Sequence, residues 1–242
     1  MMLAQIPIFI TARAYDDKMF NLNKESLKFS YLFIKEQGLF DQTYVISDNP
    51  NMITYAEDLG FKHTIYHECH SKKDILFLEY LATHQFSIKN NYYPDWIIIL
   101  NINQLFKTNS LLFDCINKID NKYDIVASYT EITDKSKFFL ENGEIKNKRN
   151  LTHILSSETK REKMIDAAIY AVKTTFAYEC MEYDDPSEHF WKHGKIKYFK
   201  NDSPYTDIHE VNDIYKFRYV CKRLNEVKNT YGCNVHSSRI LE

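Results

Sequence analysis

The chain has 242 residues, of which 44% are hydrophobic, and this length allows one main domain with a sizeable core. Its 31 lysine and arginine residues nearly balance 33 aspartate and glutamate residues, which leaves a net charge of −2. This balance argues against recruitment to nucleic acid or to an anionic membrane by a global field. Any phosphate recognition must therefore be local, and neither nucleic acid nor membrane is an expected partner.

The cysteine pattern and the hydropathy favour a cytoplasmic protein. Five cysteines are spread along the chain without a C-x-x-C pair, which is typical of reduced thiols. The stretch Met1–Pro7 lacks the basic start of a signal peptide. No apolar segment approaches the roughly 20 residues that span a bilayer.

Short apolar runs alternate with segments of helical periodicity up to Thr130, and this alternation is typical of a parallel sheet covered by helices. We predict strands at 6–12, 43–47, 62–66, 96–101 and 124–129. Helices are predicted between them at about 24–37, 50–59, 73–88 and 109–120. The first two helices are expected to end at Gly38 and Gly60, because glycine favours a left-handed C-cap.

The pattern changes after Thr130. Residues 131–164 hold one hairpin signal, Phe138–Ile145 with Asn142-Gly143 as its turn, and are predicted to form an insertion beyond the core sheet. The α/β pattern resumes with a strand at 165–172, a helix near 174–182, a strand at 195–200 and a helix at 210–224. We predict a single α/β domain over residues 1–225, followed by a loosely ordered tail at 226–242.

A ligand of an open α/β sheet binds beyond the carboxyl ends of the strands, so polar residues that follow the strands are site candidates. Those that follow the first, second and fourth strands are Arg13, Asp16, Asp17, Lys18, Asn21, Asn23, Ser47, Asp48, Asn101, Asn103, Gln104 and Lys107. Arg13 and Lys18 are cations suited to polyphosphate, while Asn23 and Asn101 carry amides that can bind a base or a sugar. The first loop contains no glycine, although phosphate loops usually rely on it.

Two of these features also have purely structural interpretations. Asp16, Asp17 and Lys18 can form a solvated turn, with Asn23 as the N-cap of the helix that follows. Asp207 and His209 alternate on a segment that reads as extended, so their side chains would share one side and could bind a divalent metal. The same alternation occurs at an exposed strand end without any function.

Five short motifs follow one another between residue 5 and about residue 225. Ala12-Arg13 and Asn23 match the spacing of A-R-x-x-S-K-x-x-x-x-K-N, and Leu39–Asp48 is similar to G-L-F-D-x-V-x-V-S-T-D. The segments Ile99–Thr108, Asp166–Tyr170 and Thr206–Ile214 are similar to L-L-Q-P-T-S-P-L-R-T, N-G-A-I-Y and D-I-D-T-x-x-D-L. In this order the chain resembles the acylneuraminate cytidylyltransferase family, whose members join CTP to an acidic sugar.

The resemblance implies a three-layer, nucleotide-diphospho-sugar transferase-like (Rossmann-like) α/β fold with a mixed, mostly parallel sheet. It also implies transfer of CMP from CTP to an acidic sugar, sialic acid or a related nonulosonic acid, with Mg²⁺ stabilising charge on the phosphates as pyrophosphate leaves. Residues 131–164 match the region through which family members pair, which implies a homodimer.

Site residues carry over from the family by position. The implied catalytic residues are Arg13, Lys18 and Asp207. The implied nucleotide-binding residues are Ala12, Arg13, Asn23, Asp48, Asn101 and Asn103. The implied acceptor-binding residues are Gln104, Lys107, Asp166 and Tyr170, and the implied metal ligands are Asp207 and His209.

Asp16, Asp17 and Leu22 stand where the family has serine, lysine and lysine. Two acids close to a triphosphate would repel it by about 1 kcal/mol or more per close contact. A catalytically silent homologue that binds a sugar, a nucleotide or a protein therefore remains an alternative. A glycosyltransferase of similar topology is a third interpretation. Such enzymes commonly have a D-x-D motif after the fourth strand, and Asn101-Ile-Asn103 at this position argues against it.

Overall fold

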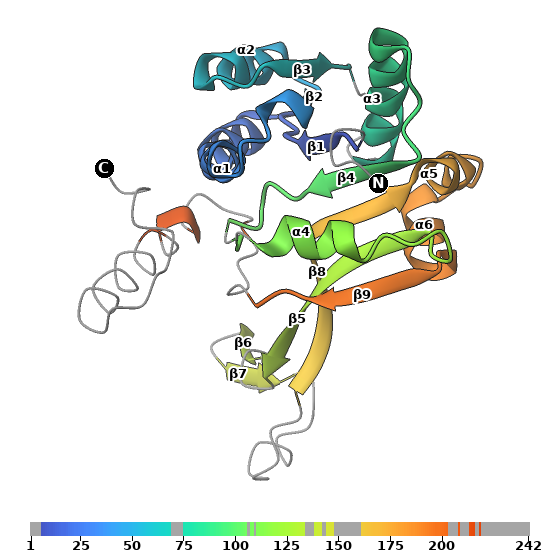
Figure 1. Ribbon diagram of the computed structural model, residues 1–242. Helices are drawn as coiled ribbons and strands as arrows, with labels where there is room; N and C mark the ends of the chain where they lie inside the picture. Colours follow the sequence, from blue (N-terminus) through green and yellow to red (C-terminus); the bar gives the residue numbers. More distant parts are fainter. Residues whose placement is uncertain are drawn as a thin grey trace.

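Helices and strands alternate along the chain and build a central sheet with helices on both faces (Figure 1). The structure is a computed structural model. It describes residues 6–68, 75–105, 107, 108, 110–133, 138–141, 144–147, 161–202, 208, 213–215 and 218. Among the helices in these ranges, none is both long enough and apolar enough to cross a membrane.

The first half of the chain supplies four strands and most of the helices. In order these are β1 (Ile8–Thr11), α1 (Asp17–Gln37), the 3-10 helix η2 (Phe40–Gln42), β2 (Thr43–Ser47), α2 (Pro50–Leu59), β3 (His63–Tyr66), α3 (Ile75–Asn90), β4 (Trp96–Leu100) and α4 (Ser110–Asn117). The second half supplies β5 (Ile125–Thr133), β6 (Phe138–Glu141), β7 (Glu144–Asn147), β8 (Arg161–Lys173), α5 (Thr174–Cys180), α6 (Pro186–His193) and β9 (Ile196–Lys200).

Seven strands form one sheet in the order β3-β2-β1-β4-β8-β5-β9. Strand β8 runs antiparallel to its neighbours β4 and β5, while the other neighbouring strands are parallel. The carboxyl ends of all strands except β8 therefore meet at one edge of the sheet. The predicted mixed, mostly parallel α/β sheet is confirmed.

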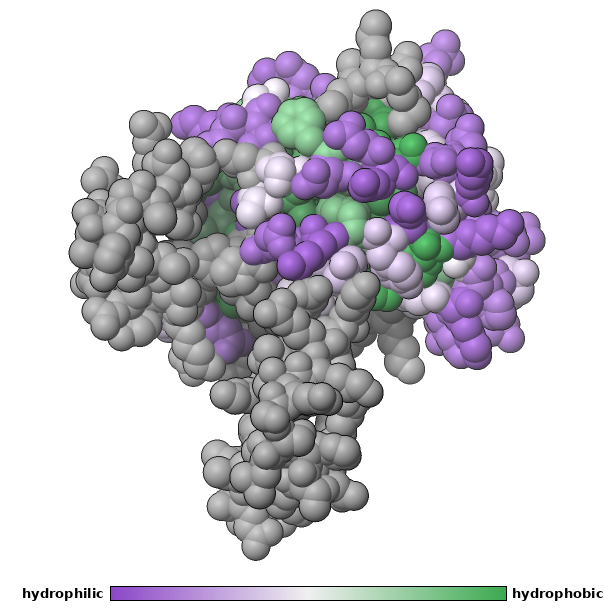
Figure 2. Space-filling model, turned by 60° about the horizontal axis from the view of Figure 1, so that its bottom comes forward, coloured by the Kyte–Doolittle hydropathy of each residue, from purple (hydrophilic) through white to green (hydrophobic). Residues whose placement is uncertain are grey.

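Alternating side chains of the strands bury two separate hydrophobic layers. Ile8, Ile10 and Ile98 pack with residues of α1, α2 and α4 on one face of the sheet. Phe9 and Ile99 pack with residues of α3, α5 and α6 on the other face. The predicted three layers are thus present. On the face shown in Figure 2, hydrophilic residues make up most of the described surface and hydrophobic ones show only between them.

The boundary of the first helix is the main error of the sequence prediction. Helix α1 begins at Asp17 rather than at Lys24, because the Asp16 carboxylate accepts a hydrogen bond from the Met19 N–H at 2.8 Å and caps the helix. The first loop is correspondingly shorter, and Asn23 lies inside the helix rather than at its N-cap. The expected glycine C-caps are confirmed, since Gly38 and Gly60 have φ values of 67° and 104°.

The second half also departs from the prediction in part. Helix α6 was not predicted, although Asp185 caps it and Pro186 occupies its first turn. Strands β5 and β8 continue past the predicted bounds and pair as far as Thr133 and Arg161, so they project as an arm below the sheet (Figure 1). The predicted hairpin is confirmed by the pairing of β6 with β7. Of the helix predicted at 210–224, the described residues Asp213–Tyr215 and Arg218 are helical.

The two C-cap glycines give a matched test of the fold. A Cβ at Gly38 meets open space, whereas a Cβ at Gly60 meets the Tyr31 hydroxyl at 3.3 Å on a backbone with larger φ. We expect Gly38→Ala to lower the free energy of unfolding by about 1 kcal/mol and Gly60→Ala by about 2 kcal/mol. Urea denaturation measures both, and equal effects would contradict the tighter environment of Gly60.

Candidate functional site

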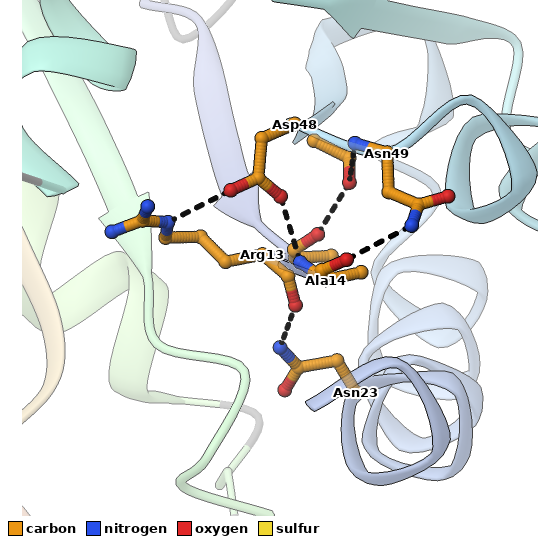
Figure 3. Close-up of polar contacts among 7 residues, drawn as sticks. Arg13, Ala14, Asn23, Asp48 and Asn49 are labelled. Carbon is orange, nitrogen blue, oxygen red and sulfur yellow. Dashed lines mark hydrogen bonds and ion pairs between the residues drawn. The ribbon is translucent and has the colours of Figure 1, made fainter. Parts of the chain in front are cut away.

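The loop from β1 to α1 is held by the residues that end β2. The Ala12 N–H donates to the Ile46 carbonyl at 2.8 Å, and the Ser47 hydroxyl donates to the Ala12 carbonyl at 2.6 Å. Asn49 donates its side-chain amide to the Ala14 carbonyl at 2.9 Å. Side chains from a neighbouring strand end therefore fix the backbone of this loop without any glycine (Figure 3).

Arg13 enters the interior at this edge and forms an ion pair with Asp48. Its Nε lies 3.1 Å from Asp48 Oδ2, and the two side chains are 6% and 2% exposed. The other carboxylate oxygen accepts from the Ala14 N–H at 2.7 Å. The guanidinium also lies over the Tyr15 ring, 5.4 Å from its centroid. Arg13, predicted to bind phosphate, thus lies buried at this edge of the sheet beside a buried carboxylate.

Asn23 and Lys18 occupy different faces of α1. The buried Asn23 side chain donates through Nδ2 to the Arg13 carbonyl at 2.5 Å, while its buried Oδ1 has no hydrogen-bond partner in the described part of the chain. Lys18 is exposed in the first turn. Arg13, Asn23 and Asp48 are therefore brought together, and Figure 3 shows Asn23 reaching the loop from the helix.

A second group of predicted residues follows β4. Asn101 donates its N–H to the Ala168 carbonyl of β8 at 3.1 Å, and its Oδ1 accepts from the Asn103 N–H at 2.9 Å. The Asn103 Oδ1 is buried and has no hydrogen-bond partner among the described residues, and Gln104 is buried. Because β4 pairs with β1, this loop and the Arg13 loop lie at the same edge of the sheet.

Lys107 ends this second group. Its ammonium donates to the Gln104 carbonyl at 2.5 Å. Burial of the ammonium lowers the pKa of Lys107 to about 7. At neutral pH the amine of Lys107 therefore populates both its charged and its neutral form.

The two predicted acceptor-binding residues on β8 face different environments. Asp166 Oδ1 accepts from the Ser128 hydroxyl and from the Ala168 N–H, and its Oδ2 accepts from the Asn201 side chain at 3.0 Å. This carboxylate holds β8 against the irregular pairing between Ala127 and Tyr129 of β5. Both carboxylate oxygens of Asp166 thus already accept hydrogen bonds from groups of the protein.

Tyr170 lies on the α3 face of the sheet, away from the layer that contains α1. Its hydroxyl donates to the Glu79 carboxylate, with distances of 3.0 and 3.2 Å to the two oxygens. The Thr11 hydroxyl at the end of β1 donates to the same carboxylate at 3.2 Å. Burial, with the Glu79 charge as a second cause, raises the pKa of Tyr170 well above its ordinary value.

Glu79 was missed by the sequence analysis. A single acid in the apolar run Ile75-Leu-Phe-Leu-Glu79 was the available signal, because a carboxylate amid such residues is buried only with partners. Ser128 and Asn201 gave no comparable signal. Their contacts with Asp166 depend on pairing across three strands that are distant in sequence.

The predicted metal ligands Asp207 and His209 lie outside the described residues. Ile208 between them is described, and its N–H donates to the Asn103 carbonyl at 3.2 Å. Within the described part of the chain, no group of three or more histidine, cysteine or acidic side chains could hold a metal ion. Oxygen donors at the site are the amides of Asn101 and Asn103 and the carboxylate of Asp48.

No protein-family model matches the sequence, and no curated protein is similar to it in sequence. Solved structures, in contrast, are similar in fold. A CMP:2-keto-3-deoxy-manno-octonic acid synthetase complexed with CTP is 12% identical, with a TM-score of 0.68 over 90% of this chain and 99% of that one. The predicted nucleotide-diphospho-sugar transferase-like fold is confirmed by this likeness.

Two further structures have the same fold at lower scores. The 4-diphosphocytidyl-2C-methyl-D-erythritol synthase from Anaerococcus prevotii is 14% identical, with a TM-score of 0.57 over 89% of this chain and 97% of that one. HddC from Yersinia pseudotuberculosis, complexed with GMP-PN, is 12% identical, with a TM-score of 0.54 over 87% and 97%.

Removal of Asp48 tests the buried pair. We expect Asp48→Ala to lower the free energy of unfolding by about 3 kcal/mol, because it leaves the Arg13 charge buried without its carboxylate. Asp41→Ala is the matched control, since Asp41 pairs with Lys62 on an exposed surface. Urea denaturation should show a clear loss for the first variant and little change for the second. Equal small losses would contradict the buried pair.

The lowered pKa of Lys107 predicts a pH dependence of stability. Between pH 7 and about 10 the unfolded chain holds a proton on this amine that the folded protein has released, so stability rises with pH in this window. Lys107→Met should flatten that rise and stabilise the protein at neutral pH. The exposed Lys118→Met serves as control in the same urea titrations, and an identical pH profile for both variants would contradict the lowered pKa of Lys107.

Proposed function

We propose that the protein is a cytidylyltransferase-like enzyme that transfers CMP from CTP to an acidic sugar, either sialic acid or a related nonulosonic acid. The observation that carries this proposal is the likeness in fold, over 90% of the chain, to a CMP-sugar synthetase complexed with CTP. The arrangement at the carboxyl edge supports it, because the buried Arg13 and the side chains of Asn101 and Asn103 lie on two adjacent loops, and Asn23 reaches the first of these loops from α1. Cations and amides of this kind suit a nucleoside triphosphate.

The proposed reaction joins the sugar hydroxyl to the α-phosphorus of CTP. A new oxygen–phosphorus bond forms, the bond to the pyrophosphate breaks, and the hydroxyl proton passes to a base. Arg13 is proposed to bind phosphate, with Lys18 as a second cation at the start of α1. Ala12, Asn23, Asp48, Asn101 and Asn103 are proposed to line the nucleotide site.

The acceptor is proposed to lie beside the β4–α4 loop, at Gln104 and Lys107. The half-neutral amine of Lys107 suits it to receive the hydroxyl proton. Asp166 and Tyr170 are proposed to act on the acceptor through the backbone that they hold. Their side-chain oxygens already contact Ser128, Asn201 and Glu79.

Mg²⁺ is proposed as the cofactor, with Asp207 and His209 as ligands. The described residues fit such an ion in one respect: the buried Asn103 Oδ1, which no other described residue hydrogen-bonds, is a hard oxygen donor on the residue whose carbonyl accepts from the Ile208 N–H. Magnesium commonly uses few protein ligands and completes its shell with phosphate oxygens and water. When bound, it would neutralise charge on the phosphates of CTP.

A homodimer and a cytoplasmic location complete the proposal. The arm formed by β5 and β8 extends beyond the core sheet as far as Thr133 and Arg161, and Ile165 at its base, opposite Tyr129, is 40% exposed. A strand pair that projects from the core in this way suits pairing with a second copy. Size-exclusion chromatography with light scattering measures the oligomeric state directly.

Pyrophosphate release tests the activity. The protein is incubated with Mg²⁺, a panel of acidic sugars and either CTP or GTP, and we expect release with CTP and at least one acid. Arg13→Ala should lower kcat/KM by about 10- to 100-fold, the loss expected for a charge-assisted hydrogen bond. The exposed Lys35→Ala on the far end of α1 is the matched control and should keep the parent rate.

A silent homologue is the second candidate, and the Arg13–Asp48 pair favours it, because the carboxylate competes with phosphate for the guanidinium. This candidate predicts no pyrophosphate release with any acid. Thermal unfolding separates a silent homologue that binds nucleotide from one that does not, because CTP raises the melting temperature only of a protein that binds it. Absence of both release and stabilisation would overturn the cytidylyltransferase proposal.

A further inference from the structure

A cavity of about 480 Å³ lies between α1 and the helical residues near the C-terminus. Its described lining comes from one face of α1 and from the segment opposite: Asn21, Lys24, Glu25, Lys28, Ile214, Tyr215 and Arg218. The α1 residues recur at helical spacing, so they form one continuous wall. A cavity of this size accommodates a small ligand. Arg13 and Asp48 are not among its lining residues.

The charges of this cavity are unequal. Three of its described lining residues are cationic and one, Glu25, is acidic. Glu25 is shared between two cations, since its carboxylate lies 2.7 Å from Lys28 Nζ and 2.9 Å from Arg218 Nη2. One carboxylate therefore faces two positive charges from opposite walls.

Lys24 adds a third positive charge from a different direction. Its ammonium lies over aromatic rings, 5.0 Å from the Tyr55 centroid and 5.9 Å from the Phe20 centroid. Cation–π contacts position an ammonium without neutralising its charge. The described lining residues thus hold an excess positive charge around a space large enough for a ligand.

We infer that this cavity is a binding site for a small, multiply charged anion, such as a phosphate ester or a polycarboxylate, bound by Lys24, Lys28 and Arg218. Such an anion would take over the role that Glu25 has alone, namely to hold Arg218 against α1. Guanidinium and ammonium donors suit both phosphate and carboxylate oxygens. The Tyr215 ring and Ile214 side chain supply an apolar wall beside the charges.

Occupation of this site would also fix the C-terminal segment. Ile208 and Ile214 of that segment pack with Leu22 and Phe29 of α1 and with Leu105 of the β4–α4 loop. An anion between Arg218 and α1 would hold this cluster closed. Hydrogen exchange of the amides at 213–218 should therefore slow when the anion binds.

Isothermal titration calorimetry with inorganic phosphate and with citrate tests the site. We expect at least one of the two anions to bind, and Lys24→Gln and Arg218→Gln each to weaken it at least fivefold. Lys35→Gln is the matched control, because it removes the same charge from the same helix outside the cavity. Phosphate-only or citrate-only binding identifies which chemistry the site prefers.

Two further measurements distinguish this site from the proposed nucleotide site. Arg13→Ala should leave the affinity for the anion unchanged while it abolishes stabilisation by CTP. Slower hydrogen exchange at 213–218 when the anion binds the parent protein is a second measurement. It does not depend on whether the variants fold. No heat with either anion, or equal weakening by Lys24→Gln and Lys35→Gln, would overturn the inference. Neither result depends on whether the protein releases pyrophosphate.

Discussion

The positive charge of Arg13, carried below the surface at the carboxyl edge of the sheet, constrains the rest of this site. An arginine cannot be deprotonated in a protein, so its burial is tolerable only with a partner close by. Asp48 is that partner, and it comes from the end of β2, the strand beside β1. The register between these strands is therefore a condition for the charge to be buried at all. Any phosphate bound by Arg13 shares it with Asp48 or displaces that carboxylate.

The same constraint explains how the first loop does without glycine. In a glycine-rich phosphate loop the backbone N–H groups turn toward the ligand. Here the Ala14 N–H is taken by Asp48, while the Ala12 and Ala14 carbonyls accept from Ser47 and Asn49. The loop is stabilised by side chains from β2 and by Asn23, so its shape does not depend on left-handed backbone angles. A phosphate bound at this loop would then be held by side chains more than by the backbone.

The sequence predicted the strands of the sheet and the edge where the site lies, but not the side-chain contacts between residues of different strands and helices. The apolar runs of β2 and β4 are short and bounded by polar residues, so their positions followed directly from the pattern. The start of α1 did not, because both interpretations of Asp16 kept it in a loop before the helix, whereas its hydrogen bond from the Met19 N–H makes it the N-cap. The pairing of Arg13 with Asp48 and of Tyr170 with Glu79 joins residues that are far apart in sequence. No local pattern contains that information.

Leu22 shows that a departure from a family pattern can have a structural cause. The resembling family has a lysine at this position, yet Leu22 is 1% exposed and packs with Leu105, Ile208 and Ile214. An ammonium in that cluster would lose its hydration among apolar side chains. The leucine instead joins α1 to the β4–α4 loop and to the segment that carries Ile208, whose N–H bonds the Asn103 carbonyl. Leu22 thus contributes to the packing that holds Ile208 and Ile214 beside the β4–α4 loop.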